Sequence, residues 1–326
     1  MLFVDHPEDF RGLMPGFLPL PLPGSMAHQE GLAPRPACPI LVENLVKAVC
    51  GAAPELFEKG ESRDTVMPGL WDWWLLASRA AESQYDILRR AIDQDGPLPG
   101  RVVCLALEGA GFHGQQERRW AVVRGNLHLT VGLPCDLEAA SCGLALTMLP
   151  AVAVVDALGA LDEGSSRLPG VGIKWVNDVL IQGRKVGGVL TSARSVDGQI
   201  QSVVLGIGLN VAVAPKIEPT AFTPGVTCLE DHIPMGGKGL GTILAAVLEA
   251  LARRFEELAS RGPEPLLAAY CQASVILGRQ VEVRQEDGSA RKGRVLGIGP
   301  DLALTLADSS LPVTAGRLIL FPGDRP

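Results

Sequence analysis

Two lysines, a carboxylate and a glycine pair stand close together between residues 170 and 192, in GVGIKWVNDVLIQGRKVGGVLTS. Apolar runs on either side of a Gln-Gly-Arg turn predict a β-hairpin. Lys174 and Asp178 would end its first strand, and Lys185 would open its second. The glycine pair that follows leaves its peptide N–H groups unobstructed, which suits close approach of a carboxylate or phosphate. The hairpin therefore predicts a site for an anionic ligand.

A second polar side chain interrupts a run that is otherwise apolar. Asn210 lies in QSVVLGIGLNVAV, residues 201–213, which is typical of a central strand buried on both faces. A buried polar group costs free energy unless it finds a partner. Beside Asp178, Asn210 would supply oxygen ligands of the kind that Mg²⁺ prefers. The pair therefore predicts a metal site.

Strands and helices of a mixed fold surround the hairpin. Strands are expected over 70–77, 100–111 and 125–133, and helices over 80–93 and 239–262. The segment 137–164 is small and apolar all round, which predicts one long buried helix. After Tyr270, four or five short strands with Asp-Gly and Gly-Pro turns predict a small β-barrel. The fold class expected is α/β (α+β).

Residues 1–65 differ in composition and pattern from the rest of the chain. Prolines punctuate residues 13–25, which favours an extended chain, and one or two short amphipathic helices should follow. The predicted boundaries are therefore an N-terminal extension over 1–65, a central domain over 66–268 and a C-terminal domain over 269–326. No pattern of a helix-turn-helix with a basic recognition helix occurs in the extension.

Composition excludes several classes of protein. A formal net charge of -7 argues against a general nucleic-acid-binding protein, because phosphate binding needs clustered Lys and Arg. The seven cysteines are scattered and never spaced as CxxC, so reduced cysteines are expected rather than a metal site. No apolar run approaches the roughly 18 residues of a membrane helix, and no signal peptide is recognisable. A cytoplasmic location without membrane contact is the expectation.

The hairpin resembles the hallmark of the biotin–protein ligases. That family shows Lys-Trp-Pro-Asn-Asp, then a lysine before a small-residue/Gly pair, then Gly-Ile-Gly-Ile-Asn-Val; this chain has KWVNDVLIQGRKVGGVL and VVLGIGLNV. GAGFHGQQERRW and GNLHLTV stand where the family has its glycine/arginine loop and its NLYLS strand, and VTCLEDH resembles its Thr-Ser-Leu segment. The resemblance spans about residues 66–326. It implies a biotin/lipoate-ligase-type mixed sheet with helices, followed by an SH3-like barrel.

The reaction that the resemblance implies has two steps. The carboxylate of biotin attacks the α-phosphorus of ATP, giving biotinyl-adenylate and pyrophosphate, and a lysine of a biotin carboxyl-carrier domain then attacks the adenylate. Lysines and Mg²⁺ suit a reaction that brings two anions together. Lys185 would be the catalytic residue, bridging the carboxylate and the α-phosphate, and Asp178 and Asn210 would serve the metal. Asp178 is also the candidate to polarise the incoming lysine. A homodimer is left open.

The resemblance also implies a set of residues that bind the acid and the nucleotide. Lys174 would hold the nucleotide, Trp120 would wall its pocket, and the backbone at Gly187 and Gly188 would face biotin. The full predicted substrate-binding set is Ser83, Gln84, Gly111, Gly114, Arg118, Arg119, Trp120, Lys174, Asn177, Gly187, Gly188 and Gly208.

Three departures from the family pattern affect the substrate more than the fold. The family loop reads Gly-Arg-Gly-Arg-x-x-Arg-x-Trp; this chain lacks its first two arginines, and only Arg118 or Arg119 could compensate. The family's Ser-Thr-Asn is replaced by Glu-Ser-Gln at 82–84, and Val176 replaces a proline. Two alternatives therefore remain open: a ligase for another acid such as lipoate, and a paralogue that binds a ligand or partner protein without turnover.

Overall fold

The computed structural model describes most of the chain as two compact units. The first comprises Met1–Asp136, Ser192–Gly208 and Gly237–Ala245, and the second comprises Leu137–Thr191, Leu209–Gly236 and Ala246–Pro326. The residues that the structure describes are 1–10, 17–19, 40–50, 55–59, 70–142, 144–161, 170–233, 239–307 and 309–321.

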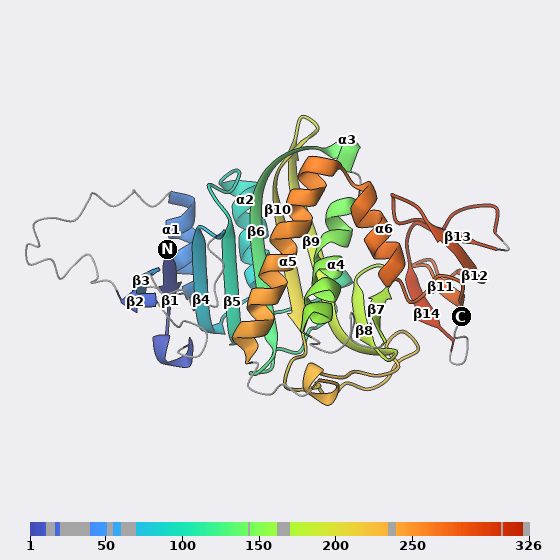
Figure 1. Ribbon diagram of the computed structural model, residues 1–326, viewed down its shortest axis with the longest axis horizontal. Coiled ribbons are helices and arrows are strands. Elements are labelled where there is room, and N and C mark those ends of the chain that lie inside the picture. Colours follow the sequence, from blue (N-terminus) through green and yellow to red (C-terminus); the bar gives the residue numbers. More distant parts are fainter. Residues whose placement is uncertain are drawn as a thin grey trace, which may run out of the picture. The chain divides into compact units, whose positions relative to one another are not determined.

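A mixed sheet forms the framework of the first unit (Figure 1). Its strands run in the order β2-β3-β1-β4-β5-β6-β10. Strand β4 pairs in parallel with both β1 and β5, whereas β5 and β6 are antiparallel. The bounds are β1 Leu2–Val4, β2 Phe17–Pro19, β3 Glu55–Lys59, β4 Trp73–Ala80, β5 Val102–Gly109, β6 Leu127–Glu138 and β10 Gln199–Leu209.

Two helices of the first unit pack against this sheet and each other. Helix α1 (Ile40–Cys50) contacts β4 and α2 (Gln84–Gln94). Helix α2 buries Leu88 and Ile92, four residues apart on one face, while its arginines remain in solvent. The start of α2 lies shortly after β4 and therefore brings Ser83 and Gln84 to one end of the sheet.

The first residues of the chain are part of this sheet. Strand β1 lies between β3 and β4, and the Met1 amino group donates to the carbonyl of Asp72 at 2.7 Å. In the short 3-10 turn Pro7–Phe10, Asp9 accepts a hydrogen bond from Ser78 and pairs with Arg124 at 3.1 Å. Helix α1 agrees with the predicted amphipathic helix. Of the proline-punctuated stretch 13–25, residues 17–19 form β2 and the remainder lies outside the described residues.

The predicted hairpin is present in the second unit with one correction. Its first strand is divided into β7 (Val171–Lys174) and the antiparallel β8 (Asp178–Ile181), so Asp178 begins β8 and does not end the first strand. Strand β8 pairs with β9 (Arg184–Val196), whose last residues belong to the first unit. Helix α4 (Ala145–Ala160) packs against β7, β8 and α6 (Glu264–Ala273). Apolar residues all round α4 are explained by this burial between layers.

One sequence prediction needs correction here. In place of a single helix over 137–164, β6 continues to Glu138 and is followed by the short α3 (Ala139–Cys142) and then by α4. A glycine, the residue with the lowest helix propensity after proline, separates α3 from Leu144 in the sequence.

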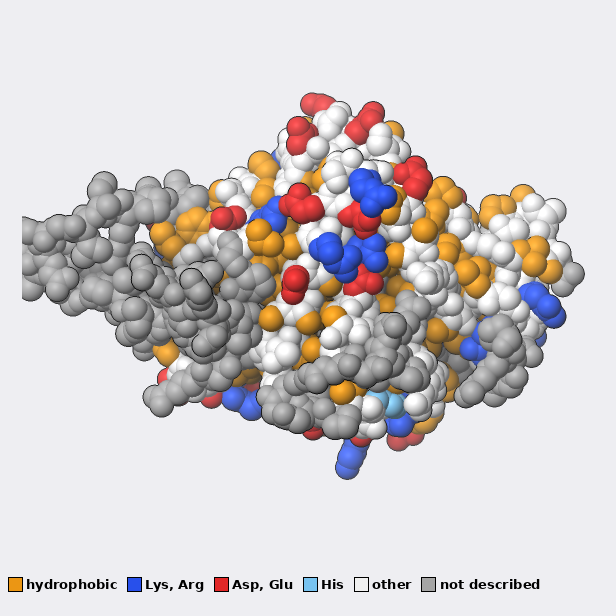
Figure 2. Space-filling view, in the orientation of Figure 1, with side chains coloured by type: hydrophobic (Ala, Val, Ile, Leu, Met, Phe, Trp, Pro, Cys, Tyr) orange, Lys and Arg blue, Asp and Glu red, His pale blue; other side chains and the backbone are white. Residues whose placement is uncertain are grey.

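The long amphipathic helix over 239–262 is observed as α5 (Leu240–Arg261), whose first six residues belong to the first unit. Within the second unit, Asp156 of α4 pairs with Arg253 and Arg254 of α5, each at 2.7 Å. Figure 2 shows charged side chains of both signs gathered over α4 and α5. None of the helices in the described part of the chain combines the length and apolar character that a membrane crossing requires.

The C-terminal strands form a separate antiparallel sheet in the order β13-β12-β11-β14. Their bounds are β11 Gln280–Arg284, β12 Ala290–Ile298, β13 Leu304–Leu306 and β14 Arg317–Leu320. The Asp-Gly hairpin between β11 and β12 is confirmed: Gly288 has a φ of 84°, and Asp287 accepts from the Ser289 amide at 2.8 Å. Four strands agree with the expected number, while closure into a barrel stays a prediction.

Candidate active site

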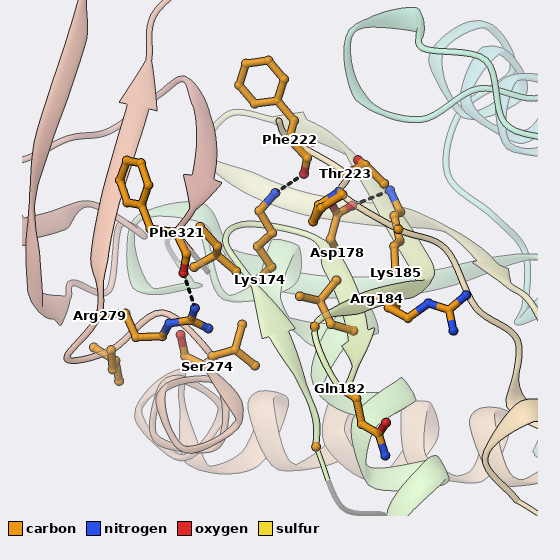
Figure 3. A pocket seen from close by; sticks show the side chains of 18 residues that line it. Lys174, Asp178, Gln182, Arg184, Lys185, Phe222, Thr223, Ser274, Arg279 and Phe321 are labelled. Carbon is orange, nitrogen blue, oxygen red and sulfur yellow. Dashed lines mark hydrogen bonds and ion pairs between the residues drawn. The ribbon is translucent and has the colours of Figure 1, made fainter. Parts of the chain in front are cut away.

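Lys185 and Asp178 form an ion pair in the second unit, with 2.5 Å between Nζ and Oδ1 (Figure 3). The turn between β8 and β9 uses Gln182 and Gly183, both with positive φ, and returns the chain beside β8. A bulge between Val179 and Leu180 follows in the ladder, so that Lys185 lies opposite Leu180. Both partners of the pair retain about a fifth of their exposure, at 22% and 18%. They can therefore still meet a ligand.

Lys174 approaches the same place from the end of β7. It is 6% exposed, and its Nζ donates to the carbonyl of Phe222 at 2.5 Å. The Phe222 ring lies under the guanidinium of Arg317, 3.6 Å from the ring centroid, and 5.8 Å from that of Arg284. Two strands of the C-terminal sheet therefore hold the segment that covers Lys174.

A pocket of about 1210 Å³ joins these side chains and lies wholly within the second unit. Figure 3 shows Lys174, Asp178 and Lys185 on one side, with Arg279 near Phe321 on another. Four cations and one carboxylate line it among the described residues: Lys174, Arg184, Lys185, Arg279 and Asp178. A pocket with this charge balance suits a polyanionic ligand.

The glycine pair and Asn177 build the floor beside the ion pair. A Cβ placed on Gly188 would lie 3.3 Å from the Nζ of Lys185 and 3.7 Å from the Oδ1 of Asp178. Gly187 is buried in the ladder opposite Val179. Asn177 exchanges bonds with Val189: its Nδ2 donates to the carbonyl at 2.6 Å and its carbonyl accepts from the amide at 3.0 Å. Asn177 thus fixes the turn between the strands.

One polar atom of Asn210 has no hydrogen-bond partner among the residues that the structure describes. Its Nδ2 donates to the Thr227 carbonyl at 3.0 Å, and its amide donates to Val186 at 2.8 Å. The Oδ1 atom is buried without a hydrogen-bond partner. An orphaned amide oxygen of this kind can accept a donor from a ligand or coordinate a hard cation. Within the described residues, no three His, Cys, Asp or Glu side chains cluster as metal ligands.

In the first unit, the glycine loop folds into a closed turn against the start of α2. Gly111 has a φ of 72°, and a Cβ there would lie 3.8 Å from the Cα of Glu82. Gly114 donates its amide to the Arg118 carbonyl at 2.7 Å, and the Trp120 amide donates to Phe112 at 2.9 Å. These bonds close the loop on itself.

His113 ties this loop to α2. Its Nε2 lies 2.7 Å from Asp86 and its Nδ1 lies 3.0 Å from the Gly114 carbonyl. Burial lowers the pKa of His113, but the hydrogen bonds to Gly114 and Asp86 outweigh burial and raise the pKa above its ordinary value. Arg118 and Arg119 are exposed, and the Nε of Arg118 donates within the loop to Gln115 at 2.9 Å. The loop therefore brings little cationic charge inward.

Trp120 reaches from this loop onto β10. A Cβ on Gly208 would lie 2.5 Å from two atoms of the indole, so only glycine allows the ring to pack there. The indole Nε1 lies 3.3 Å from the Nδ1 of His128 on β6, the neighbouring strand. Trp120 and Gly208, both predicted as site residues, are thus brought together.

Gln84, the first residue of α2, is fully buried, and both polar atoms of its amide lack a partner within the described part of the chain. Ser83 precedes it as the N-cap residue, 4% exposed, and makes no capping hydrogen bond with its side chain. Glu82 is half exposed and pairs with Arg90 at 2.7 Å. Its carboxylate is therefore paired with a cation at the surface, which reduces the repulsion it would exert on an anionic ligand beside Ser83.

Comparison with known proteins decides the family. The sequence model of the Biotin/lipoate A/B protein ligase family matches residues 83–210. A biotin–[acetyl-CoA-carboxylase] ligase of Paracoccus denitrificans is 32% identical over 190 residues, which are 57% of this chain and 76% of that protein. The chain belongs to the biotin/lipoate protein ligase family. A ligase of the same name from Mycobacterium tuberculosis is 28% identical over 260 residues, covering 76% of this chain and 89% of the relative.

Solved structures confirm the fold of this family member. The biotin protein ligase of Aquifex aeolicus, in complex with biotin and ATP, superposes with a TM-score of 0.57 at 18% identity, covering 77% of this chain and 99% of that chain. A biotin protein ligase-like protein of unknown function from Silicibacter reaches 0.54 at 19% identity and covers 78% and 95%. The expected mixed α/β fold with a C-terminal β-sheet is thereby confirmed.

Several residues of this ligase-family site escaped the sequence prediction. Arg184, Phe222 and Arg279 line the pocket, yet they come from the first position of β9, an irregular segment and the approach to β11. None of them stands in a periodic pattern. His128 left no such signal either, because alternation with Leu127 and Leu129 puts it on the polar positions of the strand, whereas the structure buries both faces of β6 there.

Proposed function

We propose that this protein is an ATP-dependent biotin–protein ligase that forms biotinyl-adenylate and transfers biotin to a lysine of a carboxyl-carrier domain. Family membership and the named relatives support adenylate-forming ligation as the reaction class. The site contributes the choice of acid and the assignment of roles to this chain's residues.

In the first step, a carboxylate oxygen attacks the α-phosphorus, a P–O bond forms, and the bond to the leaving pyrophosphate breaks. Carboxylate and triphosphate repel each other, so the site needs fixed cations where they meet. Lys185, held by Asp178 at 2.5 Å, is placed for the reacting groups. Lys174, Arg184 and Arg279 extend the positive lining of the same pocket and would receive the phosphates.

The unsatisfied amide of Gln84 is the observation that supports biotin as the acid. Among the described residues, neither its amide nitrogen nor its amide oxygen has a partner, which costs free energy in the ligand-free protein. The ureido ring of biotin carries both a carbonyl and N–H groups, so it can satisfy both atoms. The dithiolane ring of lipoate has neither. The Gln84 amide therefore favours biotin over lipoate.

The metal predicted at Asp178 and Asn210 fits the atoms present. The orphaned Oδ1 of Asn210 and the carboxylate of Asp178 are oxygen ligands of the type that Mg²⁺ takes in addition to phosphate oxygens. A bound Mg²⁺ would neutralise phosphate charge during adenylation. Asn210 is held ready by its bonds to Thr227 and Val186, whatever occupies its oxygen.

In the second step, a lysine amine of the carrier attacks the acyl carbon, a C–N bond forms, and AMP leaves. Asp178 is the one carboxylate lining the pocket among the described residues, so it is the group available to accept the proton of the incoming ammonium. Six described cysteines are free thiols, consistent with the proposed cytoplasmic location.

The test is incubation with α-labelled ATP, Mg²⁺ and either biotin or lipoate, followed by detection of acyl-adenylate and pyrophosphate. We expect adenylate with biotin alone. Adenylate with lipoate alone would overturn the choice of acid, and none with either acid would support the paralogue that binds without turnover. Lys185→Ala should abolish adenylation while Lys47→Ala, at an exposed lysine of α1, should not.

A Gln84→Leu variant sharpens the test. Leucine removes the unsatisfied atoms, so the ligand-free protein should be at least as stable as wild type. The KM for biotin should nevertheless rise about tenfold or more, the effect of losing hydrogen bonds to a buried ligand. Gln94→Leu, at an exposed position of the same helix, is the matched control. An unchanged KM in Gln84→Leu would contradict the proposed contact.

A further inference from the structure

His128 is a buried polar residue that makes specific bonds with both ring nitrogens. It lies on β6 and is 2% exposed. Its Nδ1 lies 3.3 Å from the indole Nε1 of Trp120. Its Nε2 lies 3.2 Å from both the amide nitrogen and the carbonyl oxygen of Val123. One imidazole therefore contacts two points of the segment that leads from the glycine loop into β6.

Two donors face the ring of His128, the indole N–H at Nδ1 and the Val123 amide at Nε2, and a neutral imidazole accepts from one of them. In the tautomer that accepts from the indole, Nδ1 is the acceptor and the proton sits on Nε2. The protonated Nε2 then donates to the Val123 carbonyl. Burial is the main effect on the pKa of His128 and lowers it to about 4, so the ring is neutral at physiological pH. Protonation of Nδ1 would prevent it from accepting the indole N–H.

The indole that His128 holds has little freedom elsewhere. One of its edges packs on Gly208 so closely that a Cβ would overlap it at 2.5 Å. The amide of Trp120 is bound to Phe112, whose ring meets the His128 ring edge to face at 6.0 Å between centroids. The backbone bond to Phe112, the contact with Gly208 and the bond to His128 therefore together select one orientation of the Trp120 ring across β6 and β10.

We propose that His128 is a positioning residue of the ligase, which accepts the Trp120 indole N–H and thereby sets the wall of the substrate site before substrate binds. The role of Trp120 in the substrate site rests on the proposed function, whereas the control of the indole by His128 does not. A buried histidine that only fills the core would give stability without control of the indole. The two roles are separable because Asn places an acceptor near the position of Nδ1, whereas Phe keeps ring volume without one.

The direct test observes the indole N–H by NMR in protein labelled with ¹⁵N-tryptophan. Trp120→Phe assigns its resonance. We expect His128→Phe to shift that resonance and speed its exchange with solvent, and His128→Asn to return both toward wild type. Trp175, whose Nε1 donates to the Leu302 carbonyl at 2.8 Å, should stay unchanged as an internal control. An unmoved Trp120 resonance in His128→Phe would overturn the proposal.

Adenylation kinetics test whether His128 affects substrate binding through Trp120. The Trp120→Phe variant identifies the substrate, biotin or ATP, whose KM depends on the indole. His128→Phe should raise the KM of that same substrate about fivefold, the effect of one neutral hydrogen bond, with kcat within about twofold. A fall in kcat alone, or in thermal stability alone, would refute positioning. If the protein forms no adenylate, the NMR result still stands, so the two proposals fail separately.

Discussion

Replacing Gly208 by alanine would place a methyl group where the Trp120 indole now lies. The new Cβ would be 2.5 Å from Cε2 and Cζ2 of the ring and 2.9 Å from Nε1. Carbon atoms in contact are normally separated by about 3.5–4.0 Å, so the ring must retreat by about 1 Å. The Trp120–His128 distance is already 3.3 Å, and a retreat of that size breaks the hydrogen bond unless the strands follow.

Two costs can be estimated for Gly208→Ala. Overpacking a tight contact typically destabilises by about 1–3 kcal/mol. Leaving the indole N–H without its acceptor adds roughly 1 kcal/mol. We therefore expect the free energy of unfolding to fall by about 2–4 kcal/mol, with a rise in the KM of the substrate that contacts Trp120. Urea unfolding and adenylation kinetics measure the two effects.

A matched control for Gly208→Ala exists on another strand. A Cβ on Gly297 of β12 meets nothing within 4 Å, so Gly297→Ala should change stability by less than about 1 kcal/mol and leave KM unchanged. Equal effects of the two variants would show that the loss comes from strand glycines in general. Wild-type stability and KM in Gly208→Ala would refute the close packing of Trp120 on β10.

The remaining predictions concern titration and charge. Burial lowers the pKa of His128 from 6.5 to about 4, so the stability that the neutral ring contributes is complete above the pKa of the unfolded state and is lost as pH falls. The free energy of unfolding of the wild type should therefore fall by roughly 2 kcal/mol between about pH 7 and pH 5. Urea unfolding at each pH measures this loss, which should be absent in His128→Phe. The raised pKa of His113 gives the opposite dependence of stability on pH. Its bond to Asp86 stabilises the fold fully below about pH 6.5 and weakens as pH rises through the pKa of the folded state. The difference in unfolding free energy between wild type and His113→Gln should therefore narrow at alkaline pH. Asp178→Asn should change the unfolding free energy by less than about 1 kcal/mol, since the pair with Lys185 is partly exposed, yet it should slow adenylation; a normal rate would contradict the role of that pair.

Local sequence patterns determined much of the fold. The Asp-Gly step at 287–288 predicted the β11–β12 hairpin because glycine accepts the positive φ that this turn requires. The apolar run 201–213 predicted β10 because strands buried on both faces carry no alternation. The helix over 137–164 was wrong in one respect, because apolar composition does not mark where a chain changes from strand to helix.

The residues that line the pocket were predictable only where they lie on consecutive strands. Lys174, Asp178 and Lys185 come together because β7, β8 and β9 are consecutive. Phe222 and Arg279 reach the same pocket through tertiary contacts with the C-terminal sheet, which no local pattern encodes. The boundaries predicted at residues 65 and 268 stay predictions.

The altered glycine loop changes where the positive charge for catalysis must come from. His113 occupies the loop, but its ring is engaged by Asp86, and Arg118 turns to its own loop at Gln115. A loop closed by internal bonds holds Trp120 in one place, and we propose that this indole forms a neutral wall of the site. The screening of phosphate charge is then left to the cationic pocket of the second unit. Under the proposed function, the hairpin lysines of this pocket supply the charge that the loop does not.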